Sequence, residues 1–191
     1  MKDTRINAVT FDEENHRYYY QSGDFMKELH GITGTIGRLM GKNYPDTAIV
    51  KLASVYGKDV HKEVELWIKT GRTPFTESGK WIVSFLKDKK YKGLWAEKLV
   101  SDFVATASAV DAVGFNADGT ADLYDIKTTG NFYRDYCTYQ LSVYKYLFER
   151  VYGVKVNALY VLSPRSKRCW TVFYAGDSVA EMILKRNLEG R

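Results

Sequence analysis

Two aspartates and a lysine near the middle of the sequence have the types and the spacing that chemistry needs. Asp111 lies toward the end of one predicted strand, Asp125 lies on the next, and Lys127 follows two residues later. Because side chains alternate along a strand, Asp125 and Lys127 point to the same face. The two strands are predicted neighbours, so Asp111 and Asp125 can converge if their register and facing agree.

Such a trio is suited to hydrolysing a phosphodiester. Two carboxylates a few ångströms apart repel each other, and a divalent cation that prefers oxygen ligands, Mg²⁺ or Mn²⁺, removes this repulsion. A lysine ammonium beside them can orient or help deprotonate a water, or neutralise a developing oxyanion. On the residues alone an alternative stays open, because Asp-x-Lys on a strand is also common as a surface salt bridge.

The elements that must position this trio form a predicted hairpin. Residues 94–115 are rich in Val, Ala, Leu and Phe, residues 121–129 read as a second strand, and Asp118-Gly119 between them is typical of a hairpin turn. The trio therefore lies on adjacent strands of one sheet.

Helical patterns surround the hairpin. Apolar residues recur at helical spacing over residues 46–70, around Trp81–Leu86, from about Tyr133 to Tyr152, and over Val179–Leu188. A second hairpin is predicted over residues 158–175. This order predicts an α/β fold with a central mixed β-sheet flanked by helices.

The N-terminal residues 1–45 form an extension whose role is unassigned. Residues 7–20 read as a hairpin, in which Tyr18–Tyr20 is a buried strand or, alternatively, a stacking surface. Ile32–Met40 has helical spacing, and Thr33 or Thr35 could cap its start. The length of 191 residues favours one domain over residues 1–191.

Composition excludes several classes of protein. With 45% hydrophobic residues and no long charge block, intrinsic disorder is not expected. Two cysteines cannot build an iron–sulfur cluster or a disulfide framework, and no apolar run is long enough to span a bilayer. We therefore expect a cytoplasmic protein without a membrane partner. The net charge of +5 tolerates a polyanionic partner without demonstrating one.

Three stretches together resemble a known family. Residues 104–129, VATASAVDAVGFNADGTADLYDIKTT, resemble the core of the PD-(D/E)XK nuclease superfamily in its RecB-like exonuclease branch. Gly57–His61 matches the GxxxH motif of that branch, and Gln140–Tyr144 matches its QxxxY motif. The resemblance extends from Gly57 to Ala175 and implies a restriction-endonuclease-like core. Ser108 stands where the family usually has Gly, and we expect this small residue to be tolerated.

The resemblance also implies roles for individual residues. The implied metal ligands are His61, Asp111, Asp125 and the main-chain carbonyl of Ile126. Lys127 would be the catalytic lysine, and Glu97, ahead of the first strand, would assist catalysis through a direct or water-mediated contact. Gln140 and Tyr144 would support the site or touch the nucleic acid.

Basic side chains supply candidate phosphate contacts in two segments. They are Lys89 and Lys90 after a predicted helix, and Arg165, Lys167 and Arg168 in the second hairpin turn. Charge runs like these are also common in solvated loops, so the alternative stays open.

Together these features predict a DNA exonuclease that needs one or two Mg²⁺ or Mn²⁺ ions and carries no iron–sulfur cluster. DNA is the expected partner, and a single-strand annealing protein or a helicase is a candidate second partner, in recombination, repair or phage replication. Two alternatives remain: an inactive nucleic-acid-binding or assembly module of the same fold, and a restriction-like endonuclease or junction resolvase. Oligomeric state does not follow from the sequence.

Overall fold

A mixed sheet of five strands is the centre of the fold in the computed structural model, which describes residues 2–41, 48–129 and 132–190. Its strands lie in the order β4 (Gly93–Ser101), β5 (Ala107–Phe115), β6 (Ala121–Ile126), β7 (Val156–Ser163) and β8 (Arg168–Val172). All neighbours are antiparallel except β6 and β7. The predicted fold class, α/β with a central mixed sheet flanked by helices, is therefore confirmed.

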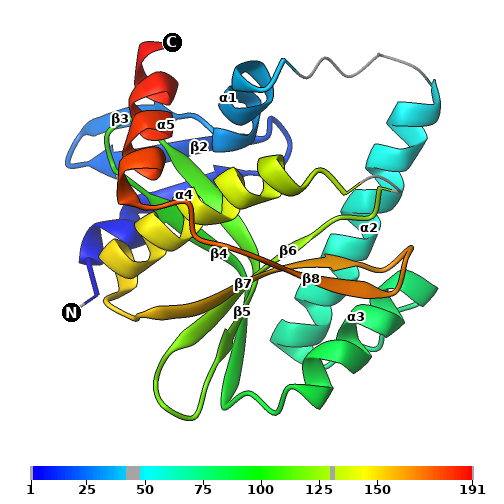
Figure 1. Cartoon of the computed structure of the whole chain (residues 1–191). Coiled ribbons are helices and arrows are strands. Elements are labelled where there is room, and N and C mark those ends of the chain that lie inside the picture. The colour runs from blue at the N-terminus through cyan, green and yellow to red at the C-terminus, as the bar shows by residue number, and fades with distance from the viewer. Residues whose placement is uncertain (1, 42–47, 130–131, 191) are drawn as a thin grey trace.

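Helices cover both faces of this sheet (Figure 1). On one face lie α2 (Ala48–Thr70) and α3 (Glu77–Asp88). On the other face lies α4 (Arg134–Tyr152), packed against α5 (Asp177–Glu189) and α1 (Ile32–Leu39). Because β6 is covered on both faces, all six of its residues are buried, as expected for a strand with a parallel neighbour. Within the described ranges, no helix has the length and apolar character needed to cross a membrane.

The connection from β6 to β7 explains why α4 lies where it does. Two parallel neighbours need a long crossover, and α4 provides it. The helix ends at Gly153, whose φ of 66° is left-handed and therefore favours glycine. Residues of α4 are thus held over the sheet directly after the strand that carries Asp125.

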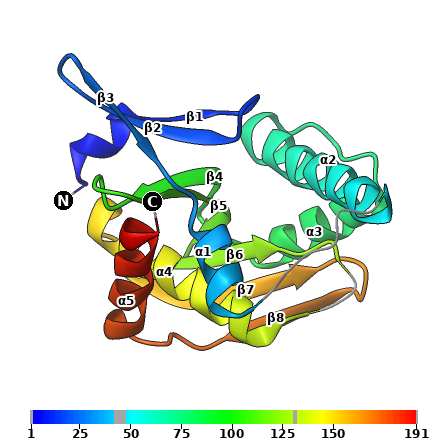
Figure 2. The ribbon, with the colours of Figure 1, turned by 90° about the horizontal axis from the view of Figure 1, so that it is seen from above.

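The N-terminal extension forms a second, three-stranded antiparallel sheet. After a short 3₁₀ helix, η1 (Thr4–Ala8), it contains β1 (Val9–Asp12), β2 (Arg17–Ser22) and β3 (Phe25–Leu29). Figure 2 shows this sheet on the β4 side of the larger sheet. The predicted hairpin is confirmed, whereas the sequence did not predict β3.

The predicted cap of α1 is wrong. The N-cap residue is Gly31, which has no side chain to accept a hydrogen bond. Thr35 is buried and donates instead to Asn187 Oδ1 of α5 at 2.5 Å. The Thr35 hydroxyl, which the sequence suggested as a cap, therefore makes a hydrogen bond between α1 and α5 instead.

Packing around β5 leads to a stability prediction. A Cβ atom added to Gly114 would overlap the ring of Tyr91, which a 2.7 Å hydrogen bond to Asp122 holds in place. We expect Gly114→Ala to lower the free energy of unfolding by about 1–3 kcal/mol. The control Gly37→Ala, at a site in α1 with no neighbouring atom within 4 Å, should raise it. Urea unfolding followed by circular dichroism measures both, and equal values would contradict the prediction.

Candidate metal centre

Three acidic residues lie in one row across three strands. Glu97 is on β4, Asp111 on β5 and Asp125 on β6. The residue pairs on either side show that Glu97 lies opposite Asp111 and that Asp111 lies opposite Asp125. Residues directly opposite each other on neighbouring strands point to the same face of the sheet. These pairs are Ala96↔Ala112, Lys98↔Val110 and Ala112↔Tyr124. The row therefore converges where the pairing of β5 with β6 ends.

Asp111 lies in the gap that opens at this point. Its Oδ2 accepts the main-chain N–H of Ile126 at 2.6 Å, so a carboxylate takes the place of a ladder partner. Its Oδ1 lies 3.4 Å from Nδ1 of His61, which comes from α2. His61 Nε2 is 3.0 Å from the Ile126 carbonyl oxygen and must donate to it, because a carbonyl only accepts. The same carbonyl is the one that the family resemblance implies as a metal ligand.

A cation could be held between α2, β4 and β5. One ligand atom each from His61, Glu97 and Asp111 lies within 4.8 Å of the other two. Two carboxylates and an imidazole nitrogen suit a divalent ion. When His61 donates through Nε2, its Nδ1 is the nitrogen that remains for a metal. These residues therefore fit the metal that the sequence predicted, without showing which metal binds.

Glu97 has an unusual backbone conformation. Its φ is 46°, which non-glycine residues rarely adopt, and it occurs here within a strand. Such a conformation costs about 1–3 kcal/mol and is found disproportionately at functional sites. The expectation that Glu97 lies ahead of the first strand of the sheet is wrong, because β4 itself carries it. Its place beside Asp111 comes from strand pairing.

Asp125 and Lys127 form the second half of the site. Lys127 Nζ lies 2.8 Å from both carboxylate oxygens of Asp125 and donates its hydrogen bond to Oδ1. Gln140 Nε2 also donates to Oδ1, at 2.9 Å, while Gln140 Oε1 accepts from Lys127 at 3.1 Å. Asp125 Oδ2 is buried and, among the described residues, accepts no hydrogen bond of good geometry, although the Lys127 ammonium lies 2.8 Å from it as an ion-pair partner. A carboxylate oxygen whose lone pairs accept no hydrogen bond can still serve as a ligand for a cation.

Gln140 and Tyr144 hold this pair from α4. Gln140 Nε2 lies 2.9 Å from the Tyr144 hydroxyl, one helical turn further along α4. Both side chains are almost fully buried, with exposures of 3% and 4%. Of the two roles that the resemblance left open, their positions favour support of the site over contact with a nucleic-acid strand.

Burial and mutual charge set the protonation of the site. Burial and the nearby Asp111 charge raise the pKa of Glu97 to about 8. Burial favours a neutral His61, but the Asp111 carboxylate outweighs this and raises the pKa of His61 to about 9. Burial also disfavours ionised Asp111, yet the charge and hydrogen bond of His61 hold the pKa of Asp111 below its usual value. At neutral pH the metal-free site thus keeps a proton on both His61 and Glu97.

The buried ion pair behaves differently. Burial raises the pKa of Asp125, and the Lys127 ammonium acts against this rise. Burial also disfavours the charged form of Lys127, but the Asp125 and Asp111 carboxylates raise the pKa of Lys127 above its usual value. Lys127 is therefore an ammonium donor in this site rather than a base.

Metal binding should consequently depend on pH. A metal ligand must be deprotonated, so Mn²⁺ must displace the protons of His61 and Glu97 below their pKa values of about 9 and about 8. We expect the apparent Mn²⁺ affinity to rise from pH 6 to pH 8 by up to about tenfold per pH unit for each proton released. Calorimetry in two buffers of different ionisation enthalpy counts these protons. An affinity that does not change with pH would contradict the prediction.

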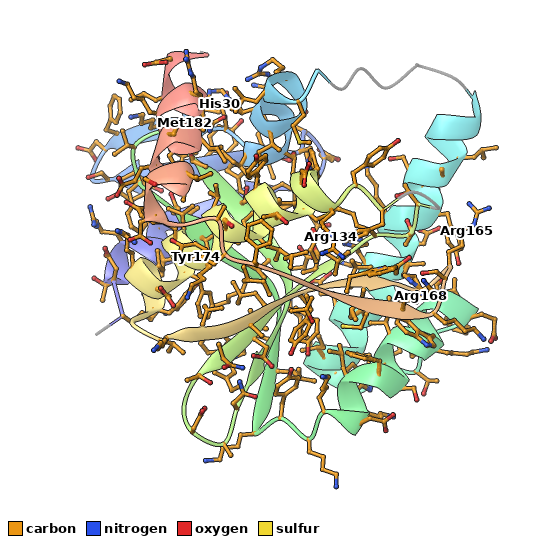
Figure 3. All side chains as sticks on the ribbon, viewed as in Figure 1. His30, Arg134, Arg165, Arg168, Tyr174 and Met182 are labelled. Carbon is orange, nitrogen blue, oxygen red and sulfur yellow. The ribbon has the colours of Figure 1, made fainter. Side chains whose placement is uncertain are left out.

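The predicted phosphate contacts lie at two ends of the larger sheet. Arg165, Lys167 and Arg168 lie in or beside the turn between β7 and β8, and Figure 3 shows both arginines there. Because Ile126 is the parallel neighbour of Leu162, this turn lies at the metal-centre end of β6.

Lys89 and Lys90 lie at the other end. They follow α3, and the adjacent Lys92 donates its main-chain N–H to Phe115, just before the turn that leads into β6. The β7–β8 group lies at the end of β6 that carries Asp125. The main chain of Lys89 and Lys90 lies toward the other end, although Lys89 Nζ reaches to 5.1 Å from the centroid of the Tyr160 ring in β7.

Tyr18, which the sequence predicted to lie in a buried strand or, alternatively, on a stacking surface, was not predicted to lie near the acidic row. It belongs to β2 of the N-terminal sheet and is 8% exposed. Burial and the charges of Glu97 and Asp111 raise the pKa of Tyr18. The sequence showed only its apolar strand context, which gave no sign of a neighbour more than 90 residues away.

Comparisons with known proteins add a fold likeness. No family model matches the chain, and no curated protein matches it. Among solved structures, it is similar to a protein from Eubacterium rectale described as a "Putative exonuclease", with a TM-score of 0.37 and 13% sequence identity. The match covers 81% of this chain and 69% of that chain. A likeness this distant says nothing about activity.

Proposed function

We propose that the protein is a divalent-metal-dependent deoxyribonuclease of the RecB-like type that removes nucleotides from DNA ends. The observation that carries this proposal is the convergence of His61, Glu97 and Asp111 beside the buried Asp125–Lys127 pair. The GxxxH and QxxxY motifs support it, because the first supplies His61 and the second supplies the Gln140 that holds Asp125.

His61, Glu97 and Asp111 would hold the metal, and Asp125 Oδ2 offers a further oxygen. When bound, Mg²⁺ or Mn²⁺ polarises a phosphate and lowers the pKa of a coordinated water. Lys127, kept charged by Asp125, can donate to an oxygen on which negative charge develops. Gln140 fixes both partners of that pair, so the ammonium is oriented before substrate arrives.

DNA would approach along the end of the sheet that carries the β7–β8 turn. Arg165, Lys167 and Arg168 are the side chains available there for phosphate contacts, and binding through them should weaken as salt is raised. A role in recombination, repair or phage replication follows, in the cytoplasm of a bacterium or a phage-infected cell. A single-strand annealing protein or a helicase is the class of partner we propose.

The test compares DNA with and without ends. End-labelled linear DNA and covalently closed circular DNA are incubated with the protein and Mg²⁺, Mn²⁺ or EDTA. The proposal predicts release of label from linear DNA with either metal, none with EDTA, and no cutting of the closed circle. Cutting of the circle would assign an endonuclease. Tight DNA binding without hydrolysis of either substrate would assign an inactive binding module.

A further inference from the structure

Two residues of β8 lie on the same face of the sheet as the Asp125–Lys127 pair. Val161 of β7 is the direct neighbour of Asp125 on one side and of Trp170 on the other. Direct neighbours on adjacent strands point to the same face, so Trp170 and Asp125 share one face of the sheet. Residues two apart on a strand share a face as well, and Arg168 therefore lies on this face with Trp170.

Arg168 lies in the row of Lys127, two strands away. The main-chain N–H of Lys127 donates to Leu162 O at 2.9 Å, which continues the pairing of β6 with β7 by one residue and brings Lys127 beside Ser163. Ser163 in turn pairs with Arg168. Neighbouring strands are about 4.8 Å apart, so the main chains of Lys127 and Arg168 are about 10 Å apart. The Lys127 side chain is 27% exposed and Arg168 is exposed, so both ends of this row are open to solvent.

Aromatic rings fix the direction of the Arg168 side chain. Its guanidinium carbon lies over the Trp170 ring, 5.4 Å from the centroid, where the face of the ring attracts a cation. The indole is itself stacked on Phe132, with centroids 5.1 Å apart and ring planes at 8°. Within the described ranges, Trp170 Nε1 has no hydrogen-bond partner, so stacking rather than a hydrogen bond orients the indole. The stack also attaches the segment between Lys127 and α4 to β8.

Arg168 differs from the other two basic residues at the β7–β8 turn. In the part of the chain that the structure describes, none of the three forms an ion pair with a carboxylate, and only Arg168 contacts an aromatic ring. A side chain that is already ordered loses less entropy when it binds. Arg168 is therefore suited to one fixed contact, whereas Arg165 and Lys167 are suited to diffuse attraction.

We propose that Arg168 sets the register of the DNA strand by binding one backbone phosphate within three linkages of the one that is cleaved, and that Trp170 orients its guanidinium for this contact. The inference rests on the proposed function, which brings the scissile phosphate to the metal centre. One strand of duplex DNA carries a phosphate about every 3.4 Å of helix axis, so a separation of about 10 Å reaches no further than the third linkage from the scissile one.

The test replaces single phosphates of a DNA oligonucleotide by neutral methylphosphonates, one linkage at a time from each end. Affinities for wild type, Arg168→Ala and Arg165→Ala are measured by fluorescence anisotropy with Ca²⁺ in place of Mg²⁺, and the scissile linkage is located on unmodified DNA with Mg²⁺. In wild type, one neutral linkage within three of the scissile one should weaken binding by about 10-fold or more, because it lacks the charge that Arg168 binds.

The two arginine variants should differ in this dependence on linkage. In Arg168→Ala the binding loss at that one linkage should disappear, since the contact is already missing. In Arg165→Ala it should persist, although binding to every oligonucleotide is weaker. Circular dichroism confirms that both variants, which change exposed side chains, are folded.

Each outcome separates the two proposals. A loss of the same size at every linkage in wild type and Arg168→Ala overturns the contact, and so does a loss that disappears equally in Arg165→Ala. If wild type shows the Arg168-dependent loss but never hydrolyses DNA with Mg²⁺ or Mn²⁺, the contact stands and the nuclease does not. If wild type hydrolyses DNA without this loss, the nuclease stands and the contact does not. If it neither binds nor hydrolyses DNA, both are overturned.

A second pair of variants tests the orienting role of Trp170. Trp170→Leu removes the ring beside the guanidinium, and Trp170→Phe keeps a ring there. We expect Trp170→Leu to weaken binding of unmodified DNA about 3- to 10-fold and to reduce the loss at the same linkage, and Trp170→Phe to restore most of both. Mn²⁺ affinity should be unchanged in both variants. If Trp170→Leu does not fold, Phe132→Leu removes the ring stacked on Trp170 and is measured in the same way. Equal losses in Trp170→Leu and Trp170→Phe overturn the orienting role.

Discussion

Asp111→Asn is expected to lower kcat for DNA hydrolysis by a factor of about 10³ or more, which corresponds to roughly 4 kcal/mol of transition-state stabilisation. The amide oxygen can still accept the Ile126 N–H, so the strand gap stays closed and the fold is retained. What disappears is the negative charge between His61 and Glu97. Mn²⁺ affinity should therefore fall together with activity.

A matched variant distinguishes the loss of this charge from a general effect of removing a carboxylate. Asp118 lies in the turn between β5 and β6, is exposed, and accepts hydrogen bonds from Thr120. Because Asn-Gly suits such a turn as well as Asp-Gly, Asp118→Asn should keep wild-type kcat and Mn²⁺ affinity. Single-turnover assays with saturating Mg²⁺ measure both variants. If Asp111→Asn keeps more than a tenth of wild-type kcat, Asp111 is not a metal ligand.

Lys127→Met is expected to lower the free energy of unfolding by about 3–5 kcal/mol at neutral pH, because it leaves the buried Asp125 carboxylate without its partner charge. The side chain of Asp125 is only 2% exposed, so water cannot replace the ammonium. Hydrolysis should be lost as well. Urea unfolding gives the first quantity and the end-labelled DNA assay gives the second.

The double variant Asp125→Asn/Lys127→Met separates stability from chemistry. It removes both charges and keeps an amide oxygen that can accept from Gln140, so most of the lost stability should return. Hydrolysis should not return, since the ammonium donor is still missing. If Lys127→Met is as stable as wild type, the ion pair is not buried as described. If the double variant hydrolyses DNA at the wild-type rate, Lys127 has no part in catalysis.

Local patterns predicted the contacts that lie within one element. Asp125 and Lys127 are two residues apart on a strand, and Gln140 and Tyr144 are one turn apart on a helix, so spacing alone placed each pair on one face. The structure adds hydrogen bonds of 2.8 Å and 2.9 Å within these pairs. Such predictions succeed because they need only the period of the element.

Contacts between distant segments could not be predicted in this way. Nothing in Leu94–Leu99 signals the positive φ of Glu97, since only pairing with β5 brings Glu97 beside Asp111. The strand Phe25–Leu29 lacks a clear alternation and becomes a strand by pairing with β2. The charges of Glu97 and Asp111 help to raise the pKa of Tyr18, and these residues come near one another only in the folded chain.

The most direct measurement is the location of bound manganese. Crystals of the wild-type protein, grown or soaked with Mn²⁺, are used to collect anomalous diffraction data, and the anomalous difference map reveals the ion independently of any assumed chemistry. A peak bounded by His61 Nδ1 and the carboxylates of Glu97 and Asp111 is the predicted result. A map with no peak there at millimolar Mn²⁺, or with manganese bound only elsewhere, would contradict the metal centre and the nuclease activity proposed from it.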